Sequence, residues 1–300
     1  MGLTSVIKIK SLCKKYHFWP SRKSGQNFLV DEKTLAKIVS AANLDPQDTV
    51  LEIGAGFGTL TFALAPRVKK VIAVELDKRL VKALRDLLNV QNVENVESVK
   101  VVKNVEVIEG DVFKLRTMNQ ELRTIRDLNY KLVSNLPYNI TSFVLRNFLE
   151  IKPRPSEMTL LVQKEVAERI TAKPGEMSLL SVVCQFYGQP EIISDVSKEN
   201  FWPQPEVDSA ILRIQGIAGD SGGCKGLLRD VGTKEFFSLV KIGFSARRKQ
   251  LQNNLIAGLK IDRKKIRECL DKNGFDIKIR AQDLSVDDWV RLARALNYSK

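Results

Sequence analysis

Three glycines at alternate positions, Gly54, Gly56 and Gly58, place the strongest limit on what this chain can fold into. They come directly after the short apolar run 49–53, and a segment with helical spacing of apolar residues begins at Thr59. Glycine adopts positive φ without steric cost, so the pattern predicts a tight turn from a strand into a helix, where backbone atoms can approach a ligand closely. The same turn also occurs as a purely structural connection, and its spacing differs from the Gly-x-Gly-x-x-Gly of dehydrogenases.

The segments that follow repeat the alternation of strand and helix. Residues 70–75 form a second apolar strand, and 77–88 have the spacing of an amphipathic helix. Further strands are predicted at 105–108, 131–134, 158–162 and 209–214, with further helices at 32–42, 141–150, 163–171 and 177–187. Strands that are apolar on both faces must be covered on both faces. We therefore expect an α/β fold with a doubly wound, mostly parallel sheet.

A glycine-rich segment at 216–223 separates this pattern from a C-terminal region that has helical spacing only. We predict three parts, namely a basic N-terminal arm (1–24), an α/β domain (25–215) and a small helical domain (216–300). The net charge of +13 is concentrated at the ends, because residues 1–30 have six Lys/Arg and no acid, and 216–300 have a net charge of +8. Such ends are typical of surfaces that bind a polyanion, although lysine-rich helices also serve solubility alone.

Several classes of site and location are excluded by residue types that the chain lacks or scatters. Cys13, Cys184, Cys224 and Cys269 are too far apart in sequence for a Cys-x-x-Cys site, and His17 is the only histidine. We therefore expect neither a metal site nor a histidine-based catalytic triad. Since no apolar run approaches the roughly 20 residues of a membrane span, we expect no membrane contact and a cytoplasmic location.

Two acids at the ends of consecutive strands indicate the kind of cofactor. Glu75 ends the second strand, 21 residues after Gly54, where a carboxylate can accept hydrogen bonds from both hydroxyls of a ribose. Asp111 follows Gly110 at the end of the third strand, where it can accept from an adenine amine. Together they predict a cofactor that contains adenosine, and nicotinamide, flavin and S-adenosylmethionine cofactors all remain open at this point.

The turn Asn135-Leu136-Pro137-Tyr138, after the fourth strand, separates these cofactors. The exocyclic amine of adenine is a poor nucleophile, and two acceptors at its two hydrogens favour the pyramidal geometry that it needs for attack. The Asn135 side chain and the carbonyl of Leu136 or Pro137 can supply them, and proline fixes the backbone there. Tyr138 offers a ring for stacking on a base. Alone, this turn could be an ordinary connection between a strand and a helix. After the glycine turn and the two acids, it predicts methylation of an adenine amine.

In their order along the chain, these motifs resemble those of the ribosomal RNA adenine N6,N6-dimethyltransferases, the bacterial small-subunit enzyme and its eukaryotic counterpart. The residues that carry the resemblance are 25–29 (Gly-Gln-Asn-Phe-Leu), 52–61, 74–77, 110–111, 135–140, 163–167, 201–210 and 244–251. The segment 89–105 is longer than the family pattern predicts, and we expect an insertion there.

The resemblance implies a Rossmann-like class I methyltransferase that uses S-adenosylmethionine, releases S-adenosylhomocysteine and requires no metal. Its implied substrate is a pair of adjacent adenosines near the 3′ end of small-subunit (16S-type) ribosomal RNA, methylated during ribosome biogenesis. The implied partner is the small ribosomal subunit, and we expect the enzyme to be a monomer. The part at 25–215 would then be the catalytic domain, and 216–300 would face the RNA.

The resemblance also implies a role for individual residues. Those implied at the cofactor are Asn27, Leu29, Gly54, Gly56, Glu75, Asp111 and Asn135. Those implied at the reacting amine are Asn135, Leu136, Pro137 and Tyr138. Phe201 is implied in the target-base pocket, although it could equally anchor its loop in the core. Arg247, Arg248 and Lys249 are implied in phosphate contacts, and otherwise would be a solvated helix end.

Three other functions are compatible with parts of this pattern. The large-subunit adenine methyltransferases of macrolide resistance have a nearly identical catalytic turn, but the segments 201–210 and 247–255 favour the small-subunit enzyme. A non-catalytic ribosome-assembly factor or transcription factor on the same fold would not need Asn135. A dehydrogenase would need an acid or base for hydride transfer, and the sequence offers no candidate.

Overall fold

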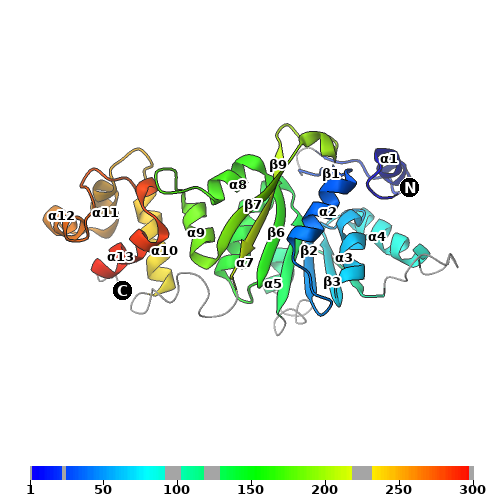
Figure 1. The fold of residues 1–300 in the computed structure, drawn as a ribbon, viewed down its shortest axis with the longest axis horizontal. Coiled ribbons are helices and arrows are strands. Elements are labelled where there is room, and N and C mark those ends of the chain that lie inside the picture. The colour runs from blue at the N-terminus through cyan, green and yellow to red at the C-terminus, as the bar shows by residue number, and fades with distance from the viewer. Residues whose placement is uncertain (1, 22–24, 92–102, 118–128, 218–231, 297–300) are drawn as a thin grey trace. The chain divides into compact units, whose positions relative to one another are not determined.

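The computed structural model of the chain describes residues 2–21, 25–91, 103–117, 129–217 and 232–296 (Figure 1). Most of the expected insertion at 89–105 and Cys224 lie outside these ranges. The chain forms two compact units, of which the first comprises residues 1–167 and 191–215 and the second 168–190 and 216–300. Residues 168–190, expected within the α/β domain, thus group with the C-terminal residues.

The first unit is built on a seven-stranded sheet with the order β4-β3-β2-β5-β6-β9-β7. The strands are β2 (Thr49–Ile53), β3 (Lys70–Glu75), β4 (Val105–Glu109), β5 (Tyr130–Asn135), β6 (Glu157–Gln163), β7 (Gln189–Val196) and β9 (Ser209–Gln215). The pairs from β4 to β6 are parallel, and β9 runs antiparallel to β6. The predicted doubly wound, mostly parallel α/β fold is therefore confirmed.

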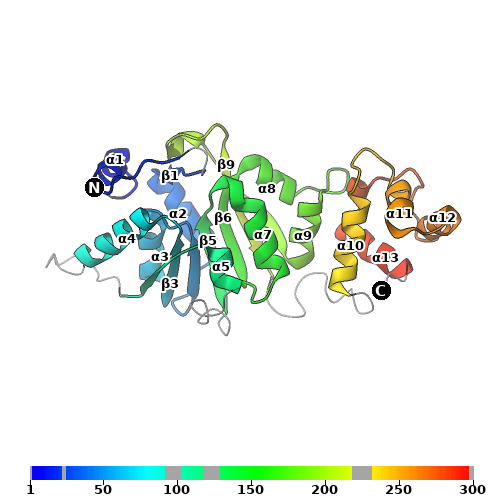
Figure 2. The ribbon, with the colours of Figure 1, turned by 180° about the vertical axis from the view of Figure 1, so that it is seen from behind.

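Helices cover both faces of this sheet. Figure 1 shows α2 (Glu32–Ala41), α3 (Thr59–Leu64) and α4 (Lys78–Gln91) on one face, and Figure 2 shows α5 (Val112–Thr117) and α7 (Thr141–Glu150) on the other. Since β2 is buried at all five of its residues, it has the apolar character expected of a strand covered on both sides. Because β2, β3, β4 and β5 run parallel, their carboxyl ends share one edge of the sheet, and Gly54, Glu75, Asp111 and Asn135 lie there.

The N-terminal arm forms a helix that packs within this unit. In α1 (Val6–Lys15) the buried side chains are Ile9, Leu12 and Cys13, which cluster with Phe18 and Phe57. Lys10, Lys14 and Lys15 remain exposed on the other side. After the arm, β1 (Phe28–Leu29) pairs antiparallel with β8 (Phe201–Trp202) in a separate two-stranded sheet.

The second unit is helical in the part of the chain that the structure describes. It comprises α9 (Leu179–Tyr187), α10 (Thr233–Gly243), α11 (Leu251–Leu259), α12 (Arg263–Lys272) and α13 (Val286–Ala295), while α8 (Lys164–Ile170) crosses the boundary between the units. The Phe186 ring stacks on that of Phe236, with centroids 4.8 Å apart. This contact between α9 and α10 explains why residues 168–190 belong to the second unit.

Short 3-10 helices complete the described elements, namely η2 (Ala65–Arg67), η3 (Tyr138–Ile140), η4 (Lys198–Asn200) and η6 (Ala281–Asp283). Among the described residues, no helix has both the length and the apolar character needed to cross a membrane.

Candidate active site

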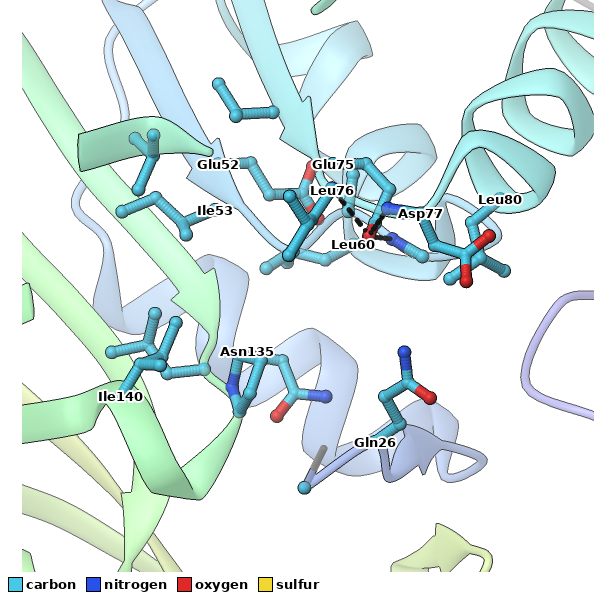
Figure 3. Close-up of a pocket in the computed structure, with 18 of the residues that line it drawn as sticks. Gln26, Glu52, Ile53, Leu60, Glu75, Leu76, Asp77, Leu80, Asn135 and Ile140 are labelled. Carbon is cyan, nitrogen blue, oxygen red and sulfur yellow. Dashed lines mark hydrogen bonds between the residues drawn. The ribbon is translucent and has the colours of Figure 1, made fainter. Parts of the chain in front are cut away.

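A cavity of about 680 Å³ lies at the carboxyl edge of the sheet (Figure 3). Turns that follow β2, β3, β4 and β5 line it, together with the segment that includes β1. All seven residues predicted at the cofactor line this one cavity, namely Asn27, Leu29, Gly54, Gly56, Glu75, Asp111 and Asn135. Figure 3 shows Glu75 and Asp77 on one side of the space, with Asn135 and Gln26 facing them.

The glycine turn after β2 forms part of the cavity wall. Gly54 and Gly56 have φ values of 73° and 59°, which residues other than glycine rarely adopt. A Cβ at Gly56 would also lie 3.1 Å from Cε1 of Phe28, so the ring packs directly against the turn. A substitution at Gly56 would therefore be strained in its backbone and crowded by Phe28.

Glu75 is a buried carboxylate held by backbone amides. Its Oε2 accepts a hydrogen bond from the amide of Gly56 (2.9 Å), and its Oε1 accepts from the amides of Leu76 (2.8 Å) and Asp77 (3.0 Å). Burial raises the pKa of Glu75 above its ordinary value, and the three amides oppose this shift. The carboxylate is thus fixed in position where a ligand in the cavity can reach it.

Asp111 and Leu76 lie beside Glu75 along the same wall. Asp111 lies just before α5, and its Oδ1 accepts from the amide of Phe113 (2.9 Å). Leu76 is 69% exposed although it lines the cavity, which is unusual for a large apolar side chain. It offers apolar contact to a ligand next to the two carboxylates. The sequence prediction missed Leu76, and its only signal was an apolar residue directly after the strand-end acid.

Asn135 is oriented by the N-terminal segment. Its Nδ2 donates a hydrogen bond to the carbonyl of Asn27 (3.1 Å), 108 positions away in the sequence. A carbonyl can only accept, so this contact assigns the amide nitrogen to the side facing Asn27. Oδ1 is consequently the end of the amide that is left to accept from a ligand.

The rest of the turn at 135–138, predicted to be catalytic, has the rigid geometry expected of its proline. Pro137 has φ −56° and ψ 129°, and its carbonyl accepts from the amide of Ile140 (3.1 Å). Tyr138 shares a 2.6 Å hydrogen bond between its Oη and Oγ of Ser209, which holds the ring in place. Burial raises the pKa of Tyr138 above its ordinary value near 10, so the hydroxyl is neutral at physiological pH.

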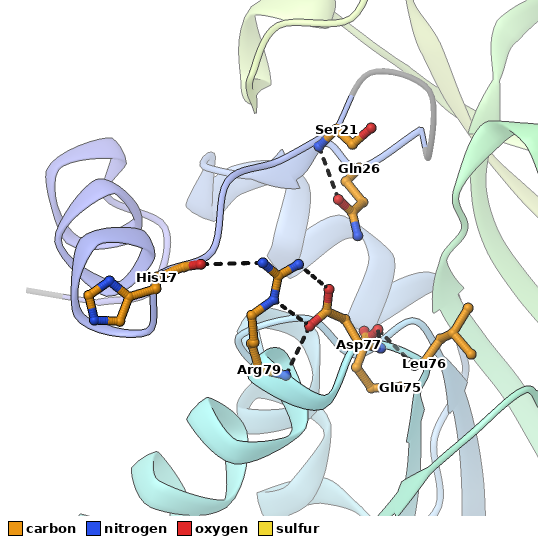
Figure 4. Close-up of polar contacts among 7 residues, drawn as sticks. All are labelled: His17, Ser21, Gln26, Glu75, Leu76, Asp77 and Arg79. Carbon is orange, nitrogen blue, oxygen red and sulfur yellow. Dashed lines mark hydrogen bonds and ion pairs between the residues drawn. The ribbon is translucent and has the colours of Figure 1, made fainter.

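The N-terminal arm is tied to the cavity wall by Arg79 (Figure 4). Its guanidinium donates to Asp77 through Nε (3.0 Å) and Nη2 (2.7 Å), and to the carbonyl of His17 through Nη1 (3.3 Å). The amide of Ser21 donates to Oε1 of Gln26 (3.1 Å), whose side chain lies at the cavity. Sequence reasoning also missed Gln26, although it directly precedes Asn27.

A second carboxyl group, that of Glu52, is buried in the cavity wall at 2% exposure. Its Oε2 accepts from the hydroxyl of Thr61 (2.6 Å). Burial is the main cause that raises the pKa of Glu52 to about 8, and the nearby charge of Glu75 adds to it. In the folded chain Glu52 is therefore mostly protonated at neutral pH.

The pKa of Glu52 predicts a pH-dependent difference in stability between the wild type and Glu52→Gln. The folded pKa of about 8 lies above the ordinary value of 4.5, so the stabilising effect of the protonated form is lost as pH rises between these values. Glutamine never ionises. From pH 6 to pH 8 the free energy of unfolding of the wild type should fall by about 2–3 kcal/mol relative to Glu52→Gln. Guanidinium denaturation at both pH values measures this, and parallel pH profiles would contradict a neutral Glu52.

The predicted RNA-contacting residues are not all brought to the cavity. Phe201 is buried in the core of the first unit, where β8 pairs it with Leu29, and it is not among the lining residues. Its contact with the target base stays a prediction. Arg247, Arg248 and Lys249 are exposed in the turn between α10 and α11, in the second unit.

Nearly the whole length of the chain matches a known protein family. Residues 20–298 match the ribosomal RNA adenine dimethylase family. The chain belongs to this family. It is therefore a methyltransferase of ribosomal RNA adenine, with a Rossmann-like α/β fold.

Individual relatives agree with this assignment to the dimethylase family. Over 287 residues the chain is 41% identical to the ribosomal RNA small subunit methyltransferase A of Dehalococcoides mccartyi (strain CBDB1), a match that covers 96% of this chain and 92% of the relative. The 23S rRNA methyltransferase ErmE has a similar structure, with a TM-score of 0.67, 29% identity, and coverage of 90% of this chain and 99% of ErmE. A dimethyladenosine transferase from Plasmodium falciparum is also similar in structure, with a TM-score of 0.66 and 26% identity. The match covers 87% of this chain and 94% of that protein.

Within the described ranges, no group of three or more His, Cys, Asp or Glu side chains lies close enough together to hold a metal ion.

Proposed function

We propose that this dimethylase transfers methyl groups from S-adenosylmethionine to N6 of two adjacent adenosines near the 3′ end of small-subunit ribosomal RNA. The observation that carries the proposal is the Asn135 amide, which the carbonyl of Asn27 orients within the cavity that also holds the Glu75 carboxylate. The curated relative named as a small-subunit methyltransferase supports the choice of subunit.

The residues in the cavity fit an adenosine-containing cofactor. Glu75 is the acceptor for the two ribose hydroxyls, Asp111 is the acceptor for the adenine amine, and Leu76 gives the base an apolar contact. Gly54 and Gly56 have no side chains of their own, so the methionine part can approach the backbone of this turn closely. When bound, S-adenosylmethionine supplies an electrophilic methyl group on a sulfonium.

On the RNA side, the chain binds and orients the reacting amine. Oδ1 of Asn135 and a backbone carbonyl accept hydrogen bonds from the two N–H groups of this amine, which favours the pyramidal nitrogen needed for attack. The carbonyl of Pro137 already accepts from Ile140, so Leu136 is the better candidate for the second acceptor. The Tyr138 ring, held by Ser209, covers the face of the target base. No general base is needed, since alignment and electrostatics lower the barrier and the proton leaves to water afterwards.

Exposed basic residues supply the phosphate contacts. They are Lys10, Lys14 and Lys15 on α1, in the first unit, and Arg247, Arg248 and Lys249, in the second. Because backbone phosphates contribute much of the affinity for nucleic acids, these residues would fix the register of the RNA rather than select its sequence. The proposal includes a cytoplasmic location and a monomeric enzyme, the latter open to light scattering after size-exclusion chromatography.

The test of this function is methyl incorporation into separated ribosomal subunits from bacteria that lack the modification. We expect the purified protein to form N6,N6-dimethyladenosine at two adjacent positions of the small-subunit RNA and to leave the large subunit unlabelled. Digestion of the RNA and mass spectrometry of the fragments measure both. Methylation confined to the large subunit would instead assign the chain the activity named for ErmE.

A further inference from the structure

The rim of the cavity carries an exposed aromatic side chain that the proposed mechanism does not use. Among the described residues, seven large apolar side chains are exposed, and two of them, Leu76 and Phe143, line the cavity. Leu76 follows Glu75 at the cofactor end. Phe143 is 54% exposed and lies in the first turn of α7, directly after η3 of the catalytic turn.

The Phe143 ring is held in place rather than free to turn. It meets the ring of Phe113, from the first turn of α5, with centroids 4.3 Å apart and an interplanar angle of 66°. This edge-to-face contact occupies part of the ring, and the exposed part remains at the cavity mouth. A braced ring loses little conformational freedom when a ligand stacks on it, so it binds a flat partner at low entropic cost.

We propose that Phe143, braced by Phe113, stacks on the adenosine next to the one that occupies the target pocket. This inference rests on the proposed function, in which two adjacent adenosines are substrates. When one of them enters the cavity at Asn135 and Tyr138, its neighbour must lie at the rim. Stacking on an aromatic side chain is the usual way in which proteins hold an unpaired base, and it favours a purine because of its larger face.

The cofactor is the other ligand that could contact Phe143, because its partner Phe113 comes two residues after Asp111 of the cofactor end. Phe143 itself lies in α7, which begins directly after η3 at the turn proposed to hold the target base, and this placement favours the RNA.

The experiment compares Phe143→Ala with Phe143→Trp, Phe143→Leu and the matched control Ile151→Ala. Ile151 is 48% exposed at the other end of α7 and does not line the cavity. With small subunits at saturating cofactor, kcat/KM should fall about 5- to 100-fold for Phe143→Ala and similarly for Phe143→Leu, which is apolar but not flat. Phe143→Trp and Ile151→Ala should stay within about two-fold of the wild type. The Kd of S-adenosylhomocysteine should not change in any variant, and a rise for Phe143→Ala would place the ring in the cofactor wall and overturn the proposal.

A second substrate makes the test specific for the neighbouring base. Reconstituted small subunits in which one of the two adenosines is replaced by uridine keep one target and lose its purine neighbour. For the wild type we expect methylation of the remaining adenosine to slow, and for Phe143→Ala we expect little further effect, because the stacking partner is already absent. Independent, multiplicative effects would overturn the proposal. A wild-type enzyme that leaves unaltered small subunits unmethylated would instead contradict the proposed function, so the two failures are distinct.

Discussion

Replacement of Asn135 by alanine is expected to lower the rate of methyl transfer by about 100- to 1,000-fold while the RNA still binds. The side chain makes its contact with the amine mainly in the transition state, where the nitrogen becomes pyramidal, so its loss should affect the rate more than the affinity for RNA. Single-turnover methylation at saturating cofactor measures the rate, because any change in cofactor affinity then has no effect on it. Filter binding of small-subunit RNA measures the affinity.

Asn273→Ala is a suitable control for the removal of an asparagine amide. Nδ2 of Asn273 also donates to a backbone carbonyl, that of Cys269 (2.7 Å), but Asn273 lies outside the cavity. Its methylation rate should remain near that of the wild type. If Asn135→Ala turned over at the wild-type rate, the assigned role of Asn135 would be wrong, and a role for the chain as a non-catalytic assembly factor would become the better explanation of its RNA binding.

The strand ends that carry the site were predictable because they depend on local pattern alone. The ranges 70–75 and 141–150, expected from apolar spacing, are those of β3 and α7 in the structure. Parallel strands bring their carboxyl ends to one edge, so Gly54, Glu75 and Asp111 had to be neighbours once the fold class was known. Local periodicity and the general geometry of α/β sheets together were enough to predict which residues lie close to one another on the cofactor side of the cavity.

Elements with weak local signals were missed. The edge strand β7 begins Gln189-Pro190-Glu191, and polar residues and proline are typical of an edge but do not predict a strand. The arm 1–24 was expected as a basic RNA-facing segment, and its buried stripe of Ile9, Leu12 and Cys13 was not recognised as a helix face. In both cases the interaction that stabilises the element comes from distant parts of the chain.

The orientation of site residues also depends on distant contacts that sequence spacing cannot reveal. The carbonyl of Asn27 orients Asn135 across 108 positions, and Ser209 holds Tyr138 across 71. Burial of Phe201 follows from its pairing with Leu29, which joins two segments that share no pattern. A motif therefore identifies which residues take part, whereas the direction in which each side chain points is decided by long-range packing.

Replacement of Glu75 by glutamine is expected to weaken binding of S-adenosylhomocysteine by about 100-fold. A carboxylate accepts from two ribose hydroxyls at once, and each hydrogen bond to a charged group contributes about 1.5–3 kcal/mol. Glutamine offers a single acceptor oxygen, and its amide group would place hydrogens against the amide of Gly56 or those of Leu76 and Asp77. Isothermal titration calorimetry at pH 7.5 measures the Kd, and a thermal melt of each variant confirms that it is folded.

The exposed Glu109 provides the matched control. Glu109 is the register partner of Glu75 on β4, but it lies outside the cavity, so Glu109→Gln should bind the cofactor product as the wild type does.

The affinity for the cofactor product should also depend on pH. Ribose hydroxyls donate to the charged form of Glu75, whose pKa burial raises above its ordinary value. Wild-type affinity should therefore fall as the pH is lowered through that pKa, because a proton must then leave before the ribose can bind. Glu75→Gln should lack this fall, and an equal pH dependence in both proteins would show that another group controls binding.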